Sequence, residues 1–328
     1  MLFHLRRLPF LAIREVIKSM NTREIFLLSL ASKKSANFVM LSISKDSLLA
    51  KFTFNRHRLL FELMPKGYFE KAHRPLPEDS YRIEEEFVPT SASSDNLHVQ
   101  CEFYSSSGTS EAEESIRKLF YSFSKKFKKS EIFIKFEDGT SEGFVIEIIR
   151  FAWENGIALN EVDFFLDKAS SETIQELLNG CNKHYTSLKI ETRIPKEFKC
   201  TPPIGGYKFK SLIVDYARWV TLDDFLQCRE FRFWTEFPDL TVEYLNGLLM
   251  KIVNMECRLE RFVFDIKSIN PSDFPEIVRG LSESAIQQEG AWQGLQFERK
   301  DGLKLMISLS NGYLDLENDL KIFKSLFL

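Results

Sequence analysis

Short apolar segments alternate with helical patterns through the second half of the chain, and this alternation limits the possible folds more than any other feature. The segments are rich in Phe, Ile, Leu and Val, which favours strands, and they centre on Ile132–Ile134, Val162–Phe165, Leu188–Ile190, Leu212–Val214, Phe231–Phe233 and Phe262–Phe264. Helices are predicted between them, several opened by a capping residue, at Ser141–Glu154, Ser171–Asn179, Thr221–Leu226, Thr241–Val253 and Pro271–Leu281. The alternation predicts a mixed α/β fold.

The spacing between successive strands narrows this class. It is irregular, roughly 19 to 31 residues, which overlaps the range of leucine-rich-repeat solenoids. The expected architecture is therefore an irregular leucine-rich-repeat-like strand/helix solenoid. A closed doubly wound sheet has the same order of elements, and periodicity does not separate the two. Further strands at Gly294–Glu298, Leu303–Leu309 and Tyr313–Leu316, the last after an Asn311-Gly312 hairpin turn, are expected to cap the open end.

Composition excludes several classes of protein. The chain has 328 residues, 44% hydrophobic and 28% charged, enough for a sizeable core. The net charge of -3 gives no global field for nucleic acid or a membrane surface, and the Lys125–Lys129 run is predicted to be a solvated helix face. The five cysteines are scattered without a CxxC pair, which favours reduced thiols in the cytoplasm or nucleus. Neither a signal peptide nor a transmembrane helix is expected.

The sequence offers no recognisable catalytic constellation. Pro202–Gly206 lacks the glycine spacing of a phosphate cradle and is predicted to be a loop. Asp223 and Asp224 are able to ligate a metal, but two acids at a helix start more simply complement the helix dipole. No HExxH or metal-ligand spacing surrounds the five histidines, which are His4, His57, His73, His98 and His184. No catalytic residue, metal or cofactor is predicted.

Two short helical patterns, separated at Met20–Thr22, begin the chain. Pro9 suits the first turn of a helix, and apolar residues then recur at three- and four-residue steps, at Phe10, Ile13, Val16, Ile17 and Met20. Asn21 and Glu24 form a capping-box-like start for a second helix that continues through Ala31. A third short helix is expected from Ser32 towards Met40.

The order of motifs in this segment resembles the nematode F-box. The matching elements are Leu8-Pro9, Ile13 with Val16-Ile17, Met20, Glu24 and the run Leu28-Ser29-Leu30-Ala31-Ser32-Lys33-Lys34. Ala31 departs from the cysteine of many members, but both residues are small and apolar.

A second resemblance is to the type 2 F-box-associated domain of nematode proteins. It is carried by Trp219–Leu226, Leu240–Leu249 and Leu259-Glu260-Arg261, which follow that domain's order of helix, strand, helix and strand. Gly247 replaces a bulkier residue of the family and weakens the expected helix by about 1 kcal/mol relative to Ala.

These resemblances imply the substrate-recognition subunit of a ubiquitin ligase, a non-catalytic protein. The F-box, residues 1–45, would bind a Skp-type adaptor and through it a cullin, and the domain at 116–328 would bind an unknown target protein. Residues 46–115 would connect them, with exposed loops on either side of a strand at Leu97–Tyr104. The implied adaptor-binding residues are Leu8, Pro9, Ile13, Val16, Ile17, Met20, Ile25, Phe26 and Leu27.

Two other functions stay open. The N-terminal helices pack equally well as the cap of a solenoid scaffold that binds no ligase, because apolar helix faces are common inside proteins. An enzyme with an α/β fold ranks third, since it would need a pocket with converging polar groups.

Overall fold

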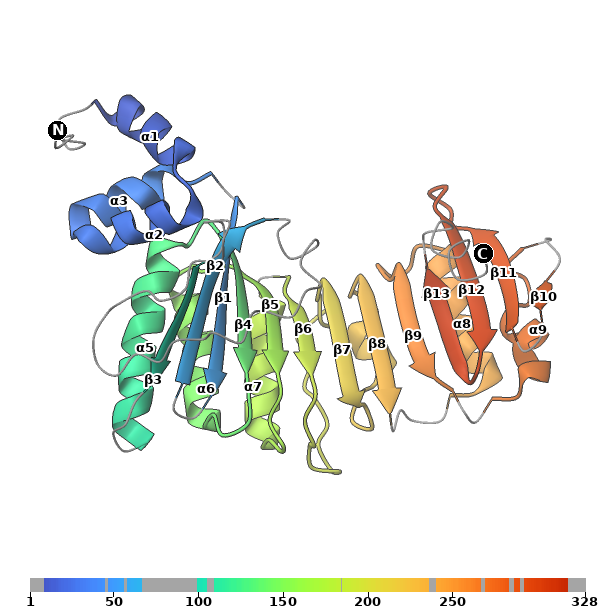
Figure 1. Cartoon of the computed structure of the whole chain (residues 1–328). Helices are drawn as coiled ribbons and strands as arrows, with labels where there is room; N and C mark the ends of the chain where they lie inside the picture. Colours follow the sequence, from blue (N-terminus) through green and yellow to red (C-terminus); the bar gives the residue numbers. More distant parts are fainter. Residues whose placement is uncertain are drawn as a thin grey trace. The chain divides into compact units, whose positions relative to one another are not determined.

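The structure is a computed structural model that describes residues 9–44, 47–55, 58–66, 99–104, 109–183, 185–235, 240–266, 269–282, 286–289 and 292–317. The chain has a mixed α/β fold (Figure 1) and forms two compact units, Met1–Leu166 and Asp167–Leu328. The division into 1–45, 46–115 and 116–328 stays a prediction.

Unit 1 begins with three short helices, as the sequence predicts. They are α1 (Phe10–Ser19), α2 (Thr22–Ala31) and α3 (Lys33–Ser42). The capping box of α2 is present: Asn21 Oδ1 accepts a hydrogen bond from the Glu24 N–H, and Glu24 Oε2 accepts one from the Asn21 N–H, both 2.9 Å long. We call residues 9–44 the helical module.

The sheet of unit 1 has the strand order β3-β2-β1-β4-β5. Strands β1 and β2 pair antiparallel, as do β2 and β3, whereas β1 pairs parallel to β4 and β4 to β5. Their bounds are Leu48–Asn55, Arg58–Pro65, Val99–Tyr104, Glu131–Phe136 and Leu159–Phe164. The predicted 46–115 connector therefore supplies three strands of the sheet. Helix α6 (Glu142–Glu154) starts at the predicted cap, where Ser141 Oγ accepts from the Phe144 N–H.

Phenylalanine rings form the core of this unit. Phe61 of β2 stacks on Phe123 with ring centroids 4.6 Å apart, and Phe54 of β1 stacks on Phe136 of β4 at 5.4 Å. Phe26 of α2 lies 5.8 Å from both Phe61 and Phe123. This contact anchors the helical module to the sheet, and the burial of such large rings is a main source of stability.

Helix α5 (Thr109–Lys126) corrects one prediction. The polar stretch up to residue 114 was expected to be a loop, but the helix begins at Thr109. Its buried positions Ile116, Phe120 and Phe123 follow helical spacing, so packing against the sheet outweighs the polar first turn. Lys125 is exposed in the last turn, as expected of a solvated helix face, whereas Lys126 is half-buried over the Phe123 ring.

Unit 2 contains strands in the order β6-β7-β8-β9-β13-β12-β11-β10. The first four are parallel and adjacent in chain order, and each later neighbouring pair is antiparallel. Their bounds, in the order of the chain from β6 to β13, are Ser187–Ile190, Ser211–Tyr216, Glu230–Thr235, Arg261–Asp265, Gln287–Glu289, Trp292–Glu298, Lys304–Ser310 and Tyr313–Glu317. All six strands predicted by the alternation are present across the two units, and the three predicted near the end form β11, β12 and β13.

The connections of unit 2 are helical. They are the helices α7 (Ser171–Asn182) and α8 (Val242–Val253), the 3-10 turns η2 (Leu222–Phe225) and η3 (Pro271–Asp273), and the single-turn α9 (Phe274–Ile277). Helix α7 extends beyond its predicted end at Asn179, whereas η3 with α9 stops short of the predicted end at Leu281. Gly247 does not interrupt α8.

Helix caps in unit 2 correct two expectations and confirm one, and the predicted hairpin turn is also present. Ser170, not Ser171, caps α7 by accepting from the Thr173 N–H, and Thr221 makes no side-chain cap bond. Thr241 caps α8 as predicted. Asn311 and Gly312 have φ of 50° and 82°, the left-handed pair of a type I′ hairpin turn.

Candidate functional site

The structure divides the predicted adaptor-binding residues by exposure. Leu8 lies outside the described residues. Val16 and Met20 are half-buried, and Pro9 and Leu27 are exposed. The remaining four are buried within the module or against the sheet, and they are Ile13, Ile17, Ile25 and Phe26. Buried side chains of the free chain hold the module together, so only the exposed ones are available for contact with a partner.

Exposed apolar side chains occur on all three helices of the module. The exposed fractions are 43% for Phe10, 70% for Leu11, 42% for Leu27 and 51% for Leu41. The sequence prediction included only Leu27 of these. Leu11 falls off the inward stripe of α1, whereas Phe10 shares the spacing of Ile13 and Ile17 and is exposed at the first residue of the helix. Leaving out the stripe positions of the predicted helix would have identified Leu11 but not Phe10.

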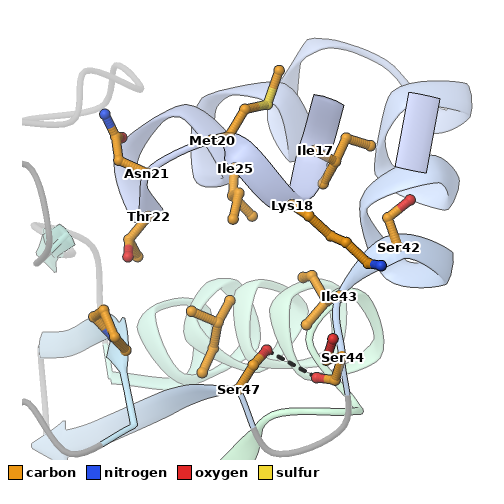
Figure 2. A pocket seen from close by; sticks show the side chains of 12 residues that line it. Ile17, Lys18, Met20, Asn21, Thr22, Ile25, Ser42, Ile43, Ser44 and Ser47 are labelled. Carbon is orange, nitrogen blue, oxygen red and sulfur yellow. Dashed lines mark hydrogen bonds between the residues drawn. The ribbon is translucent and has the colours of Figure 1, made fainter. Parts of the chain in front are cut away.

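A cavity of about 240 Å³ lies between the module and the start of the sheet (Figure 2). Ile17, Ile25, Ile43 and Leu48 supply apolar walls. Ser42 Oγ also lines it and has no hydrogen-bond partner among the described residues. The volume is below the range of ~300–1,000 Å³ typical of ligand pockets.

No protein-family model, curated protein or solved structure matches the chain. The function is therefore inferred from the residues and their geometry.

The cysteine side chains of unit 2 are poor nucleophiles. The four cysteines whose side chains are described are free, and burial raises the pKa of the Cys228 thiol to about 12 and that of Cys200 also to about 12. A thiol rather than a thiolate at neutral pH is a weak nucleophile. All five histidines lie outside the described residues.

Asp223 and Asp224 separate into two different environments. Asp223 forms an ion pair with Lys251 Nζ at 3.0 Å, and Cys200 Sγ donates a weak hydrogen bond to Asp224 Oδ2 at 3.7 Å. Over the described ranges, no group of three or more His, Cys, Asp or Glu side chains is placed to hold a metal ion. Within the same ranges, no helix is long and apolar enough to cross a membrane.

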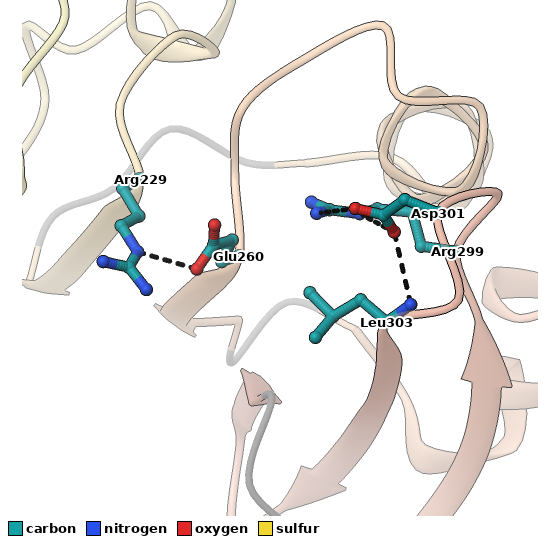
Figure 3. A network of polar contacts seen from close by, with 5 residues as sticks. All are labelled: Arg229, Glu260, Arg299, Asp301 and Leu303. Atoms are coloured by element: carbon teal, nitrogen blue, oxygen red, sulfur yellow. Dashed lines mark hydrogen bonds and ion pairs between the residues drawn. The ribbon is translucent and has the colours of Figure 1, made fainter.

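A polar network secures the turn between β11 and β12 (Figure 3). The mostly buried Arg299 donates two hydrogen bonds to Asp301, at 2.9 and 2.6 Å, and Asp301 also accepts from the Leu303 N–H at 3.2 Å. The hydrogen bonds from Arg299 hold the pKa of Asp301 at about 2. Arg229 and Glu260 form a separate pair of 2.7 Å that joins the residues before β8 and β9. Both contacts fix strand ends.

The side chains of β8, β9 and β13 that alternate with the buried phenylalanines form a second surface. Register places them in rows across the three strands. We call this surface the open face, and its rows are Trp234, Asp265 and Tyr313, then Arg232, Val263 and Asp315, then Glu230, Arg261 and Glu317. Val263, at its centre, is buried. The sequence did not predict the rows, because they require the pairing of β13 with β9.

Proposed function

We propose that the chain is the substrate-recognition subunit of a Skp-cullin-F-box type ubiquitin ligase. The helical module would bind a Skp-type adaptor, unit 2 would bind the target protein, and the chain would act in the cytoplasm or nucleus. Unit 2, with its parallel strands adjacent in chain order, would present the target-binding surface of an irregular leucine-rich-repeat-like solenoid.

One observation carries the proposal: the helical module leaves large apolar side chains uncovered on every helix. Phe10, Leu11, Leu27 and Leu41 each expose more than two fifths of their area. A module this small buries too little surface to be secure alone, and exposed apolar side chains that recur in one module mark a surface for a partner. The three-helix order and the capping box agree with the F-box resemblance.

A charge asymmetry in the module also supports a protein partner. The described module carries five basic side chains, Arg14, Lys18, Arg23, Lys33 and Lys34, against two acidic ones, Glu15 and Glu24. Lys34 lies 5.8 Å above the ring of Phe38, which in turn contacts Phe10 at 6.5 Å. Basic groups next to apolar side chains fit an acidic partner surface with an apolar centre.

Co-expression with a Skp-type adaptor, followed by size-exclusion chromatography, tests the proposal. We expect the intact chain to co-elute stoichiometrically and the Leu11→Asp/Leu27→Asp double variant to elute alone while still folded. Ile204→Asp is the matched control, because Ile204 is a fully exposed apolar residue outside the module. Well-folded intact protein that forms no complex would overturn the ligase proposal.

The alternative is a scaffold whose module only caps the sheet, and the contact of Phe26 with Phe61 and Phe123 favours it. A cap acts through its buried residues. The scaffold therefore predicts that Leu11→Asp/Leu27→Asp leaves every interaction of the chain unchanged, whereas Phe26→Ala unfolds unit 1.

A further inference from the structure

The open face presents an exposed aromatic pair. Trp234 and Tyr313 expose 37% and 36% of their area, and their rings meet edge to face with centroids 6.2 Å apart. They lie on β8 and β13, either side of β9, in one row with Asp265. Exposed Trp and Tyr are the residues most enriched at binding hot spots, and their faces attract cations.

Next to this pair lies a carboxylate with one oxygen that accepts no hydrogen bond from the described residues. Asp315 follows Tyr313 by two residues on β13, so both side chains leave the same face of the strand. Its Oδ1 atom is buried and has no hydrogen-bond partner among the described residues. A buried acceptor without a donor costs free energy. The Asp315 side chain as a whole is only half-buried, so its carboxylate is open to a donor supplied from outside.

The neighbouring guanidinium groups are already engaged by other carboxylates. Arg232 pairs with Glu230 at 2.6 Å, and Arg261 pairs with Glu317 at 2.6 Å. The described part of the open face carries four carboxylates against these two guanidinium groups, so its charge is complementary to a cation. An anionic ligand would have to displace Glu230 or Glu317 from its arginine.

We propose that the open face binds an extended segment of the target protein through an Arg or Lys side chain, which lies against Trp234 and Tyr313 and donates a hydrogen bond to Asp315. This inference rests on the proposed function, because it identifies the class of target segment that unit 2 would select. An arginine suits the site best, since its planar guanidinium stacks on aromatic rings while donating to a carboxylate.

Fluorescence anisotropy on the purified full chain tests the proposal. The probe is a fluorescein-labelled Gly/Ser peptide with Arg at alternate positions, and matched peptides carry Lys, Gln or Asp instead. We expect the Arg peptide to bind, the Lys peptide to bind more weakly, and the Gln and Asp peptides not to bind. Equal binding of the Gln peptide, preference for the Asp peptide, or no binding of the Arg peptide would overturn it.

Three variants locate the site. Asp315→Asn and Trp234→Ala should each weaken binding of the Arg peptide by about tenfold or more. Glu243→Gln removes an exposed acid from α8 and should leave binding unchanged. Circular dichroism confirms folding of each variant, and a folded Asp315→Asn variant that binds as tightly as the native chain would exclude Asp315.

The same samples separate this inference from the ligase proposal. Asp315→Asn should still co-elute with the Skp-type adaptor, because the substitution lies outside the helical module. Peptide binding without adaptor binding would support the cation site and contradict the ligase proposal. Adaptor binding without peptide binding would support the ligase proposal and contradict the cation site.

Discussion

The helical module and the open face expose opposite chemistry. The module presents apolar side chains such as Leu11 and Leu41, whereas the open face presents an aromatic pair among guanidinium and carboxylate groups. Burial of apolar area is non-directional and depends little on salt. Charge-assisted contacts are geometrically specific and are screened by salt. The module is thus suited to a constant partner, and the open face to selection among targets.

The two regions also differ in what supports them. The module depends on a few buried residues, with Phe26 as its ring contact with the sheet and α5. The open face lies over fully buried phenylalanines of β8 and β9, including Phe231, Phe233 and Phe264. Substitution of an anchor should therefore disturb the module, whereas the open face should tolerate changes to its own side chains.

The largest expected effect comes from Phe26→Ala. The ring is 1% exposed, and its loss leaves a cavity against Phe61 and Phe123. We expect a loss of about 3–5 kcal/mol in the free energy of unfolding, measured by urea denaturation of the full chain. Leu27→Ala, the exposed neighbour, should change it by less than about 1 kcal/mol. A similar small effect at both positions would show that Phe26 does not anchor the module.

The next largest effect on the free energy of unfolding is expected from Asp315→Asn, which should stabilise the chain instead of destabilising it. Burial, with the nearby Glu317 carboxylate, raises the pKa of Asp315 to about 7 despite Arg261 and Arg232. A carboxyl whose folded-state pKa is raised binds more protons when folded, so its contribution to stability falls as the pH rises from about 4 to about 7. The neutral amide avoids this loss and should stabilise the chain by roughly 2 kcal/mol above neutral pH.

Thermal unfolding of both proteins across this pH range measures the effect. The melting temperature of the native chain should fall relative to that of Asp315→Asn as the pH rises, and the difference should level off above about pH 7. The other charged groups of the open face are Glu230 and Arg232 on β8, Arg261 and Asp265 on β9, and Glu317 on β13. A constant difference at every pH would mean that Asp315 does not titrate there. If Asp315→Asn is more stable than the native chain but binds the Arg peptide more weakly, then Asp315 contributes to binding at a cost in stability.

The sequence predicts local structure far better than it predicts the open face. Strands such as Phe262–Phe264 and the capping box at Asn21 follow from residue type and spacing alone. Helix α5 was missed because its polar first turn resembles a loop, although Ile116, Phe120 and Phe123 carry a helical signal. The parallel pairing of β1 with β4 and the pairing of β13 with β9 join distant segments. No local pattern encodes such pairings, so the rows of the open face could be identified only from the structure.

A smaller effect is expected from Asn21→Ala, which removes the capping-box bond that Asn21 Oδ1 accepts and leaves the one that the Asn21 N–H donates to Glu24. Loss of such a cap costs about 1 kcal/mol, and α2 carries both the buried Phe26 and the exposed Leu27. Urea denaturation should show this loss together with weaker adaptor binding. Asn37→Ala is the matched control, because Asn37 is exposed within α3 and alanine favours a helix. Equal stability of the two variants would contradict the role of the cap.

The smallest effect is expected at Lys251, whose pairing with Asp223 lies in unit 2 outside the open face. Both side chains are largely exposed, so the ion pair is screened by water and gives up side-chain entropy. Lys251→Met, which keeps most of the aliphatic stem, should change the free energy of unfolding by less than about 0.5 kcal/mol and leave Arg-peptide binding intact. Tighter binding here would mean that the cationic probe responds to the overall charge of unit 2. An unchanged affinity, beside a large loss in Asp315→Asn, would place the selectivity for cations at the open face.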